Sequence, residues 1–305
     1  MHGLIRRSAA GAAVAVLGLV ASLMSALPAS AASAASAAPA HHRPAARGTY
    51  LALGDSVAFG YVPPEAVPPP NYHDASSFVG YPEDVARALR LRVANASCPG
   101  ETTASMFMPR VVSNGCENSP GSSTGYRTQY PLHVFYKGTQ PRFALKYLAR
   151  HRHTRLVTIN IGANDVFLCQ ETTKDHCTSQ AELTAVLKEI TANLTTIYTK
   201  IRHVAHYRGL LVALTYYSLS YSDPTQVAGT ELLNSAIASV TKAFGGKVAD
   251  GFAAFEGPSQ AAGGSPCKAG LLIKLPDGTC NIHPSAAGHL LLAQAIENVV
   301  AAQPR

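Results

Sequence analysis

The sequence predicts an α/β domain: a three-layer α/β/α sandwich around a central parallel sheet of about five strands. Three observations predict it. Short segments rich in Val, Ile and Leu recur along the chain, helical patterns separate them, and each segment ends in turn-forming or polar residues. Because strands that alternate with helices form a parallel sheet, and because such a sheet is buried on both faces, helices are expected on either side of it.

The predicted strands are residues 49–53, 91–96, 156–161, 210–215 and 247–252. The predicted helices are residues 81–89, 141–150, 181–205, 226–244 and 285–301. The clearest helix is 181–205, whose apolar side chains recur with a 3.6-residue period, and Ser179 and Glu182 form a capping box at its start. Residues 60–80 and 101–140 are irregular, and we expect them to be insertions over the carboxyl edge of the sheet.

The composition excludes several classes of protein. Hydrophobic residues make up 47% of the 305 residues and charged residues only 14%, which argues against a disordered or collagen-like chain. The net charge is +7, but the basic residues are scattered and form no block of five or more. A solvated basic surface is therefore favoured over a nucleic-acid patch, and we expect no nucleic-acid partner.

The N-terminal segment has the three parts of a secretory signal. Arg6 and Arg7 precede an uncharged apolar run at 11–27, and small residues follow it. We expect a signal peptide over residues 1–32, a flexible Ala/Ser/Pro tail over 33–47 and one folded domain over 48–303. An uncleaved membrane anchor is the alternative, although a 17-residue, Ala-rich run is short for a bilayer. The mature protein is expected to be secreted, extracellular and without a membrane span.

The chain has six cysteines, an even number that suggests disulfides in an exported protein. Six cysteines allow fifteen connectivities. Nearest-neighbour pairing is the simplest, and it gives Cys98–Cys116, Cys169–Cys177 and Cys267–Cys280. A metal site is the alternative, but no Cys-x-x-Cys occurs, and we expect no metal.

Chemistry is expected just after the strands, because ligands bind at the carboxyl ends of parallel strands. Gly54-Asp55-Ser56 follows the first strand, where a serine entering a tight turn is well placed as a nucleophile. The alternative is a helix N-cap. Gly100 follows the second strand and can offer an unhindered backbone N–H, although a loop glycine is more often only part of a turn.

Two further blocks follow the same logic. Gly162-Ala163-Asn164-Asp165 comes after the third strand, and the Asn164 amide can donate to an oxyanion or form an Asx-turn. His283-Pro284 precedes the last helix, where a histidine can act as a general base and Ser285 can cap the helix. His289, within that helix, is interpreted as a packing or surface residue.

These four blocks, in this order, resemble the SGNH or GDSL hydrolase superfamily, and the resemblance spans roughly residues 49–302. Block spacing, export and paired cysteines are particularly similar to secreted actinobacterial esterases and lipases. The resemblance implies a flavodoxin-like α/β/α fold and ester hydrolysis through an acyl-enzyme. It implies Ser56 as the nucleophile, His283 as the base, and the Ser56 and Gly100 N–H groups with the Asn164 amide as the oxyanion hole.

One position departs from the family pattern. Many members carry an aspartate three residues before the histidine, and here that position is Cys280. Neither Asn281 nor Ile282 is a carboxylate. We therefore predict a Ser–His dyad in which a backbone carbonyl near Cys280 orients His283, with Asp277 as a possible third member.

The insertions are expected to form the substrate site. An apolar cluster soon after Gly100 and several aromatic residues further on favour an apolar acyl chain over a bare acetyl group, although core packing under a long loop is an even alternative. These residues are Met106, Phe107, Met108, Tyr126, Tyr130, Phe135 and Tyr136.

The prediction is thus a monomeric esterase or lipase acting on small-molecule or lipid esters of short to medium chain length. No cofactor is expected, since Gly54 lacks the glycine-rich dinucleotide pattern. Two other functions stay open: a carbohydrate O-acetyl esterase, and a non-enzymatic secreted binding protein on the same fold.

Overall fold

The computed structural model describes residues 48–303 and contains a five-stranded parallel sheet. The predicted signal peptide over 1–32 and the tail over 33–47 lie outside the described residues. The strand order is β2-β1-β3-β4-β5. The strands are β1 (Thr49–Gly54), β2 (Arg92–Asn95), β3 (Thr154–Asn160), β4 (Leu210–Leu214) and β5 (Lys247–Ala249). The predicted α/β class and the parallel sheet are confirmed.

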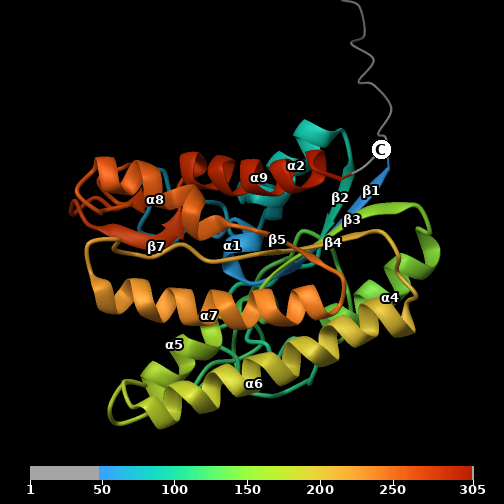
Figure 1. Cartoon of the computed structure of the whole chain (residues 1–305), viewed down its shortest axis with the longest axis horizontal. Coiled ribbons are helices and arrows are strands. Elements are labelled where there is room, and N and C mark those ends of the chain that lie inside the picture. The colour runs from blue at the N-terminus through green and yellow to red at the C-terminus, as the bar shows by residue number, and fades with distance from the viewer. Residues whose placement is uncertain (1–47, 304–305) are drawn as a thin grey trace, which may run out of the picture. The chain divides into compact units, whose positions relative to one another are not determined.

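Helices cover both faces of this sheet (Figure 1). On one face α2 (Tyr81–Leu89) packs against α9 (Ala286–Ala301), and on the other α6 (Gln180–Thr199) packs against α7 (Pro224–Ala243). All six residues of β1 are buried, as are Leu211 to Leu214 of β4. Each fully buried Val, Leu or Ile contributes about 1.5–3 kcal/mol, so the apolar strands hold the three layers together.

The path of the chain places a crevice beside β1. After β1 the chain passes through α2 to reach β2, and it then crosses back through α4 (Gln140–Arg150) to β3, on the other side of β1. Such a reversal of strand order is a topological switch point, where α/β proteins bind ligands at the carboxyl ends of the strands. The loops after β1 and β3 therefore meet at one edge of the sheet.

The last third of the domain contains two elements that the sequence did not predict. The fifth strand ends at Ala249 rather than 252, because Asp250 accepts a hydrogen bond from the Ala253 N–H and caps α8 (Gly251–Ala261). After α8 a small antiparallel hairpin forms from β6 (Leu272–Lys274) and β7 (Cys280–Pro284). His283 therefore lies on a short strand and not in an open loop.

The long predicted helix begins where expected and ends earlier. Ser179 accepts from the Glu182 N–H at 3.3 Å, but the Ser179 N–H donates to Asp175, so the capping box is only half formed. Helix α6 ends at Thr199 and continues as one turn of π-helix, η2 (Lys200–Val204). The irregular regions contain only short helices, namely η1 (Ala75–Ser77) and α3 (Tyr126–Gln129).

Three disulfides are present: Cys98–Cys116, Cys169–Cys177 and Cys267–Cys280. They are the nearest-neighbour pairs expected from the sequence. Within residues 48–303, no helix is both long and apolar enough to cross a membrane.

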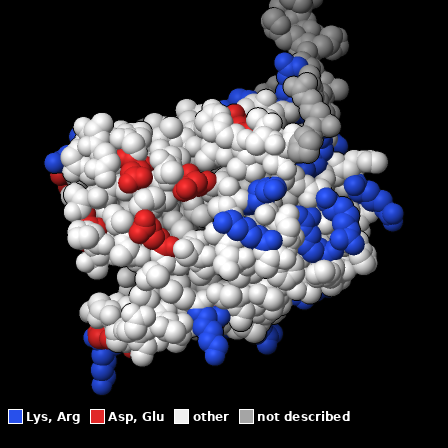
Figure 2. Space-filling view, viewed as in Figure 1, with Lys and Arg blue, Asp and Glu red and all other residues white. Residues whose placement is uncertain are grey.

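Charged side chains are unevenly distributed over the surface. Figure 2 shows Asp and Glu on one side of the visible face and most Lys and Arg on the other. Arg92, Arg155 and Lys247 lie in the first residues of their strands, and all three are exposed. The basic side is therefore the amino-terminal edge of the sheet, opposite the edge where the strand-end loops meet.

Candidate active site

Ser56 is the first residue of α1 (Ser56–Phe59), a single turn of helix directly after β1. Asp55 caps this turn by accepting from the Val57 N–H at 3.0 Å, and the Tyr216 hydroxyl donates to its other carboxylate oxygen. Gly54 has φ +150°, and a Cβ there would lie 2.3 Å from the Asn160 carbonyl oxygen. The glycine is thus required for β1 to lie against β3, and Asp55 supports the turn that presents Ser56.

His283 lies within hydrogen-bonding distance of Ser56. Its Nε2 is 2.9 Å from the Ser56 Oγ, although the two residues are 227 positions apart in the sequence. The hairpin carries His283 to this position, and the Tyr217 hydroxyl holds it there by donating to the Ile282 carbonyl at 2.7 Å. The Tyr61 ring lies 4.9 Å from the imidazole, centroid to centroid.

The other imidazole nitrogen is bonded to Asn281. Nδ1 of His283 lies 2.5 Å from the Asn281 Oδ1, and the His283 backbone N–H donates to the same oxygen at 3.1 Å. A backbone N–H can only donate, so the atom that it meets is the carbonyl oxygen of the amide. Nδ1 therefore carries the proton, and Nε2 is free to accept the Ser56 hydroxyl proton.

This contact corrects the sequence prediction for the group that orients His283. The acceptor is the Asn281 side chain, and not a backbone carbonyl near Cys280. Asp277 is also excluded from this role, since it is exposed in the hairpin turn and accepts from the Thr279 N–H and hydroxyl. Asn281 is not a carboxylate, but its amide oxygen also accepts a hydrogen bond and can fix the tautomer without supplying a charge.

The predicted oxyanion donors Gly100 and Asn164 are joined by Asn114. The Asn114 backbone N–H donates to the Gly100 carbonyl at 2.8 Å, and its Nδ2 donates to the Asn164 Oδ1 at 3.0 Å. This bond occupies the carbonyl oxygen of the Asn164 amide and leaves its NH₂ group for another partner. Gly100 has φ +77°, and a Cβ there would lie 2.3 Å from the Asn114 carbonyl oxygen, so only glycine fits.

All of these groups face one cavity of about 1390 Å³. The polar residues that line it include Ser56, Gly100, Asn114, Asn164 and His283. The structure thus brings the four predicted blocks to one place at the carboxyl edge of the sheet. Asn114 and Asn281 had no sequence signal of their own, because a single asparagine in a loop or on a short strand is not distinctive.

Two buried carboxyl groups tie the loops of the site together. Asp165 accepts from both the N–H and the hydroxyl of Thr103, at 2.8 and 2.5 Å, and so joins the loop after β2 to helix α5 (Ala163–Thr172). Glu101 accepts from the Gln140 Nε2 at 3.0 Å. Gln140 in turn bonds both the N–H and the carbonyl of Gly54, so it links the Ser56 turn to the Gly100 loop.

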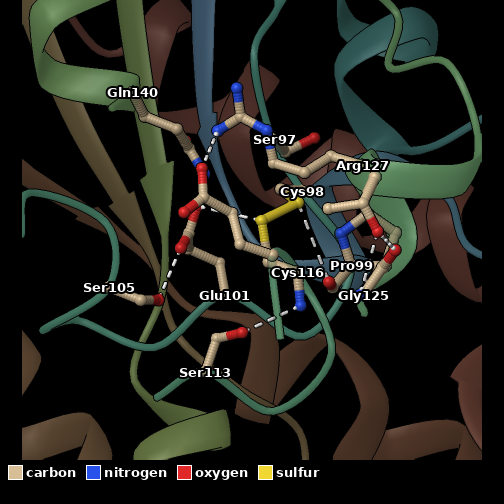
Figure 3. Close-up of a disulfide and its surroundings, with 12 residues drawn as sticks. Ser97, Cys98, Pro99, Glu101, Ser105, Ser113, Cys116, Gly125, Arg127 and Gln140 are labelled. Atoms are coloured by element: carbon tan, nitrogen blue, oxygen red, sulfur yellow. Dashed lines mark hydrogen bonds and ion pairs between the residues drawn. A yellow bond between two sulfur atoms is a disulfide. The ribbon is translucent and has the colours of Figure 1, made fainter. Parts of the chain in front are cut away.

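Figure 3 shows Glu101 beside the Cys98–Cys116 disulfide, with Ser105 and Gln140 bonded to its carboxyl group. These cysteines and Glu101 form a cluster of potential metal ligands, and Cys169, Cys177 and Glu182 form another. In both clusters the sulfur atoms are joined in a disulfide and offer no thiolate. Neither cluster therefore fits a metal.

Burial determines the protonation of the ionisable groups around the site. It lowers the pKa of His283 to about 4, so the imidazole is neutral near pH 7 and can act as a base. It lowers the pKa of the buried His289 to about 3. Burial has the opposite effect on carboxyl groups, and it raises the pKa of Asp55, Glu101 and Asp165 to about 7 each.

The apolar wall of the cavity differs from the prediction. Of the seven residues expected from the insertions, only Tyr126 and Tyr130 line the cavity. Met106 and Tyr136 are buried in the core, Phe107 packs at its edge, and Met108 and Phe135 are exposed. Much of the apolar lining comes from α5, α6 and α7 instead, and α5 is a helix that the sequence did not predict.

Comparison with known proteins identifies the family. The sequence profile of the GDSL-like Lipase/Acylhydrolase family matches residues 52–291. The chain belongs to this family. It is therefore an ester hydrolase. A search of curated proteins finds no match.

Solved structures of an esterase and a phospholipase are similar to this chain. A catalytic mutant of Axe2, an acetylxylan esterase from Geobacillus stearothermophilus, is 16% identical and has a TM-score of 0.50, with 86% of this chain and 99% of that chain covered. Phospholipase A1 from Streptomyces albidoflavus NA297 is 21% identical and has a TM-score of 0.48, with 82% of this chain and 98% of that chain covered.

Proposed function

We propose that this chain is an exported serine esterase that hydrolyses esters of apolar carboxylic acids through a Ser56 acyl-enzyme. The observation that carries the proposal is the contact of 2.9 Å between the Ser56 Oγ and the His283 Nε2, in a cavity that Gly100 and Asn164 also line. A nucleophile, a base and amide donors in one cavity are the groups that acyl transfer needs.

In the first half-reaction the Ser56 Oγ attacks the ester carbonyl carbon while His283 Nε2 takes the hydroxyl proton. The negative oxygen of the tetrahedral intermediate accepts hydrogen bonds from the Ser56 and Gly100 N–H groups and the Asn164 Nδ2. When the C–O bond to the alcohol breaks, the imidazolium gives its proton to the leaving oxygen. A water molecule then attacks the acyl-enzyme, His283 takes a proton from that water, and the acid leaves as the proton returns to Ser56.

The substrate preference is supported by the cavity lining. Aromatic side chains from the loop regions, including Tyr61, Tyr72, Tyr126 and Tyr130, form one wall, and aliphatic side chains of α5, α6 and α7 form another. Apolar surface of this kind binds an alkyl chain by removing it from water.

The test is hydrolysis of p-nitrophenyl esters of increasing acyl length by the wild-type protein, by Ser56→Ala and by the control Ser239→Ala, which changes an exposed serine of α7. We expect Ser56→Ala to lose at least about 10³-fold in kcat and the control to keep wild-type activity. If Ser56→Ala still hydrolyses these esters, Ser56 is not the nucleophile. Hydrolysis of the acetyl ester alone would favour the carbohydrate O-acetyl esterase instead.

Export through the signal at 1–32 is part of the proposal. Three disulfides in a single domain are typical of exported proteins. Expression of the full chain in a secreting bacterial host should release an active protein that begins between about residues 29 and 36, as read by N-terminal sequencing. Retention of the uncleaved chain in the membrane fraction would support the anchor alternative.

A further inference from the structure

The cavity extends away from the catalytic groups between α5, α6 and α7. In Figure 1, α5 lies on the same side of the molecule as the N-terminal ends of α6 and α7. The lining residues of α5 are Ala163, Asn164, Val166, Phe167 and Gln170, and all but Asn164 have the i, i+3, i+4, i+7 spacing of one helix face. Six residues of helix rise about 9 Å, so the cavity runs at least that far beyond Asn164.

Helix α7 lines the same part of the cavity with one continuous stripe. Its lining residues include Thr225, Ala228, Gly229, Leu232 and Leu233, the i, i+3, i+4, i+7, i+8 pattern of a single helix face. Eight residues of helix span about 12 Å. The inner end of the stripe is near the oxyanion groups, because a Cβ at Gly162, two residues before Asn164, would lie 3.3 Å from the Leu233 Cδ1.

The lining of this stretch includes buried or half-buried apolar side chains and exposed polar ones. Val166, Leu187 and Leu233 lie toward the sheet, whereas Gln170, Thr178 and Gln226 lie at the outer ends of their helices or just before them. An apolar channel that ends in polar groups fits an alkyl chain of limited length.

Gly229 is unusual within this stripe. A glycine in the interior of a helix is disfavoured relative to alanine, yet nothing in the backbone of Gly229 requires it. Its φ is not positive, and a Cβ there would meet no atom within 4 Å. Gly229 is exposed and lines the cavity, so a side chain at 229 would extend into open space along the solvent-facing side of the cavity.

We propose that the channel between α5, α6 and α7, here called the acyl arm, binds the acyl chain of the ester, and that Gly229 determines how long a chain it accepts. The inference rests on the proposed esterase function. The arm of about 9–12 Å fits a medium chain of roughly eight to ten carbons. Each methylene that enters the arm raises kcat/KM roughly fourfold until the arm is full.

The experiment compares p-nitrophenyl acetate with p-nitrophenyl octanoate in the wild-type protein, in Gly229→Leu and in the control Ser239→Leu. Ser239 is exposed on α7 and does not line the cavity, so the control adds the same side chain to the same helix. We expect Gly229→Leu to lower kcat/KM for the octanoate at least tenfold and to leave that for the acetate within about twofold. The control should change neither.

Decanoate provides a second measurement that does not depend on the chemical step. As an inhibitor of acetate hydrolysis, it should bind Gly229→Leu at least tenfold more weakly than it binds the wild type and the control. The acyl-arm proposal would be overturned if a folded Gly229→Leu variant kept the wild-type ratio of octanoate to acetate activity. It would also be overturned if decanoate inhibited that variant as strongly as the wild type. The proposed function would survive that result, because it is tested separately by the wild-type range of acyl lengths and by the loss of hydrolysis in Ser56→Ala.

Discussion

Asn281 gives the catalytic histidine an uncharged partner. Its side-chain oxygen holds the Nδ1 proton of His283 and so selects the tautomer in which Nε2 can accept from Ser56. A carboxylate in that place would also stabilise the imidazolium that forms during the reaction. With an amide there, nothing offsets the burial that lowers the pKa of His283 to about 4. We therefore expect a base that stays neutral, and active, well into the acid range.

Asn281→Asp tests this consequence. A negative charge beside Nδ1 favours the protonated imidazole and should raise the pKa of His283 by about 1–3 units. Only the neutral imidazole can accept the Ser56 proton, so the acid limb of the kcat/KM profile should move upward by the same amount. The measurement is kcat/KM from pH 4 to pH 9.

Asp277→Asn is the control for this pH profile. It changes an exposed carboxylate on the same hairpin that accepts hydrogen bonds from Thr279. It should leave the pH of the acid limb unchanged and kcat/KM within about twofold. If the acid limb of the kcat/KM profile lies at the same pH in Asn281→Asp as in the wild type, Asn281 does not face the reacting imidazole. A loss of hundreds-fold in Asp277→Asn would instead restore the carboxylate as third member.

Asn114 has a similar role toward the oxyanion hole, and Asn114→Asp tests it. A carboxylate at 114 cannot donate to the Asn164 Oδ1, so the Asn164 amide is expected to rotate and turn its NH₂ toward residue 114. An oxygen would then face the developing oxyanion. We expect kcat to fall by about 10²–10³, the usual cost of losing one oxyanion donor, with a smaller effect on KM.

Asn114→Ala separates this effect from simple loss of packing. Alanine removes the bond but leaves the Asn164 amide free to keep its NH₂ toward the cavity, so its kcat should fall less than that of Asn114→Asp. Equal losses in the two variants would mean that residue 114 only supports the loop.

At the residue scale, some site residues could be predicted from the sequence and others could not, for a physical reason. Ser56, Gly100, Asn164 and His283 each follow or precede a recognisable element, so their positions carry a local signal. Asn114 and Asn281 act through side-chain hydrogen bonds, to Asn164 and to the His283 imidazole, that depend on the folded geometry. The Asn281 contact is local in sequence, but only the hairpin geometry shows that the amide reaches the ring.

At the scale of elements, the disulfides act on the loops that carry the site. Cys98 is two residues before Gly100, and its bridge to Cys116 closes the loop that contains Asn114. Cys280 is three residues before His283, and its bridge to Cys267 fastens the hairpin. The sequence predicted these pairs from spacing alone. It could not predict the hairpin itself, because β6 and β7 have only three and five residues and no strong alternation.

Removing one bridge should therefore affect catalysis before it unfolds the domain. For the double variant Cys98→Ser/Cys116→Ser we expect a stability loss of about 3 kcal/mol from the 18-residue loop and a fall of at least tenfold in kcat. Far-UV circular dichroism and urea unfolding give the fold and its stability, and ester hydrolysis gives kcat. Wild-type kcat in a folded variant would show that the bridge stabilises the domain without positioning the loop.

At the scale of the whole molecule, the buried ionisable groups make stability depend on pH. Asp55, Glu101 and Asp165 each have a pKa of about 7 in the folded protein, because burial disfavours their charged forms. In the unfolded chain they ionise near pH 4, so the unfolded state gains stability relative to the folded state as the pH rises from about 4 to 7. The folded pKa is the higher one, and this contribution is therefore present at low pH and lost toward neutral pH.

The two buried histidines work in the opposite direction over a different range. Their folded pKa values, about 4 for His283 and about 3 for His289, lie below the ordinary value near 6.5. They therefore cost stability as the pH falls below about 6.5, and they partly cancel the carboxyl effect there. Three carboxyl groups outweigh two histidines, so the cancellation is incomplete. The melting temperature should accordingly fall steadily from pH 5 to about pH 7.5 and level off toward pH 8.

Glu101→Gln identifies the source of that fall. The amide keeps the shape of the side chain but cannot ionise, so one of the three titrating carboxyl groups is removed. The decline between pH 6.5 and 8 should become about half as steep, because the histidines still offset part of the effect of the other two carboxyl groups. Thermal unfolding of the wild type, Glu101→Gln and the exposed control Asp277→Asn at pH 5.5, 6.5 and 8 measures the three slopes. If Glu101→Gln keeps the wild-type slope while the control does too, Glu101 ionises at its ordinary pH, and the carboxyl that joins Gln140 to the oxyanion loop is charged throughout the working range.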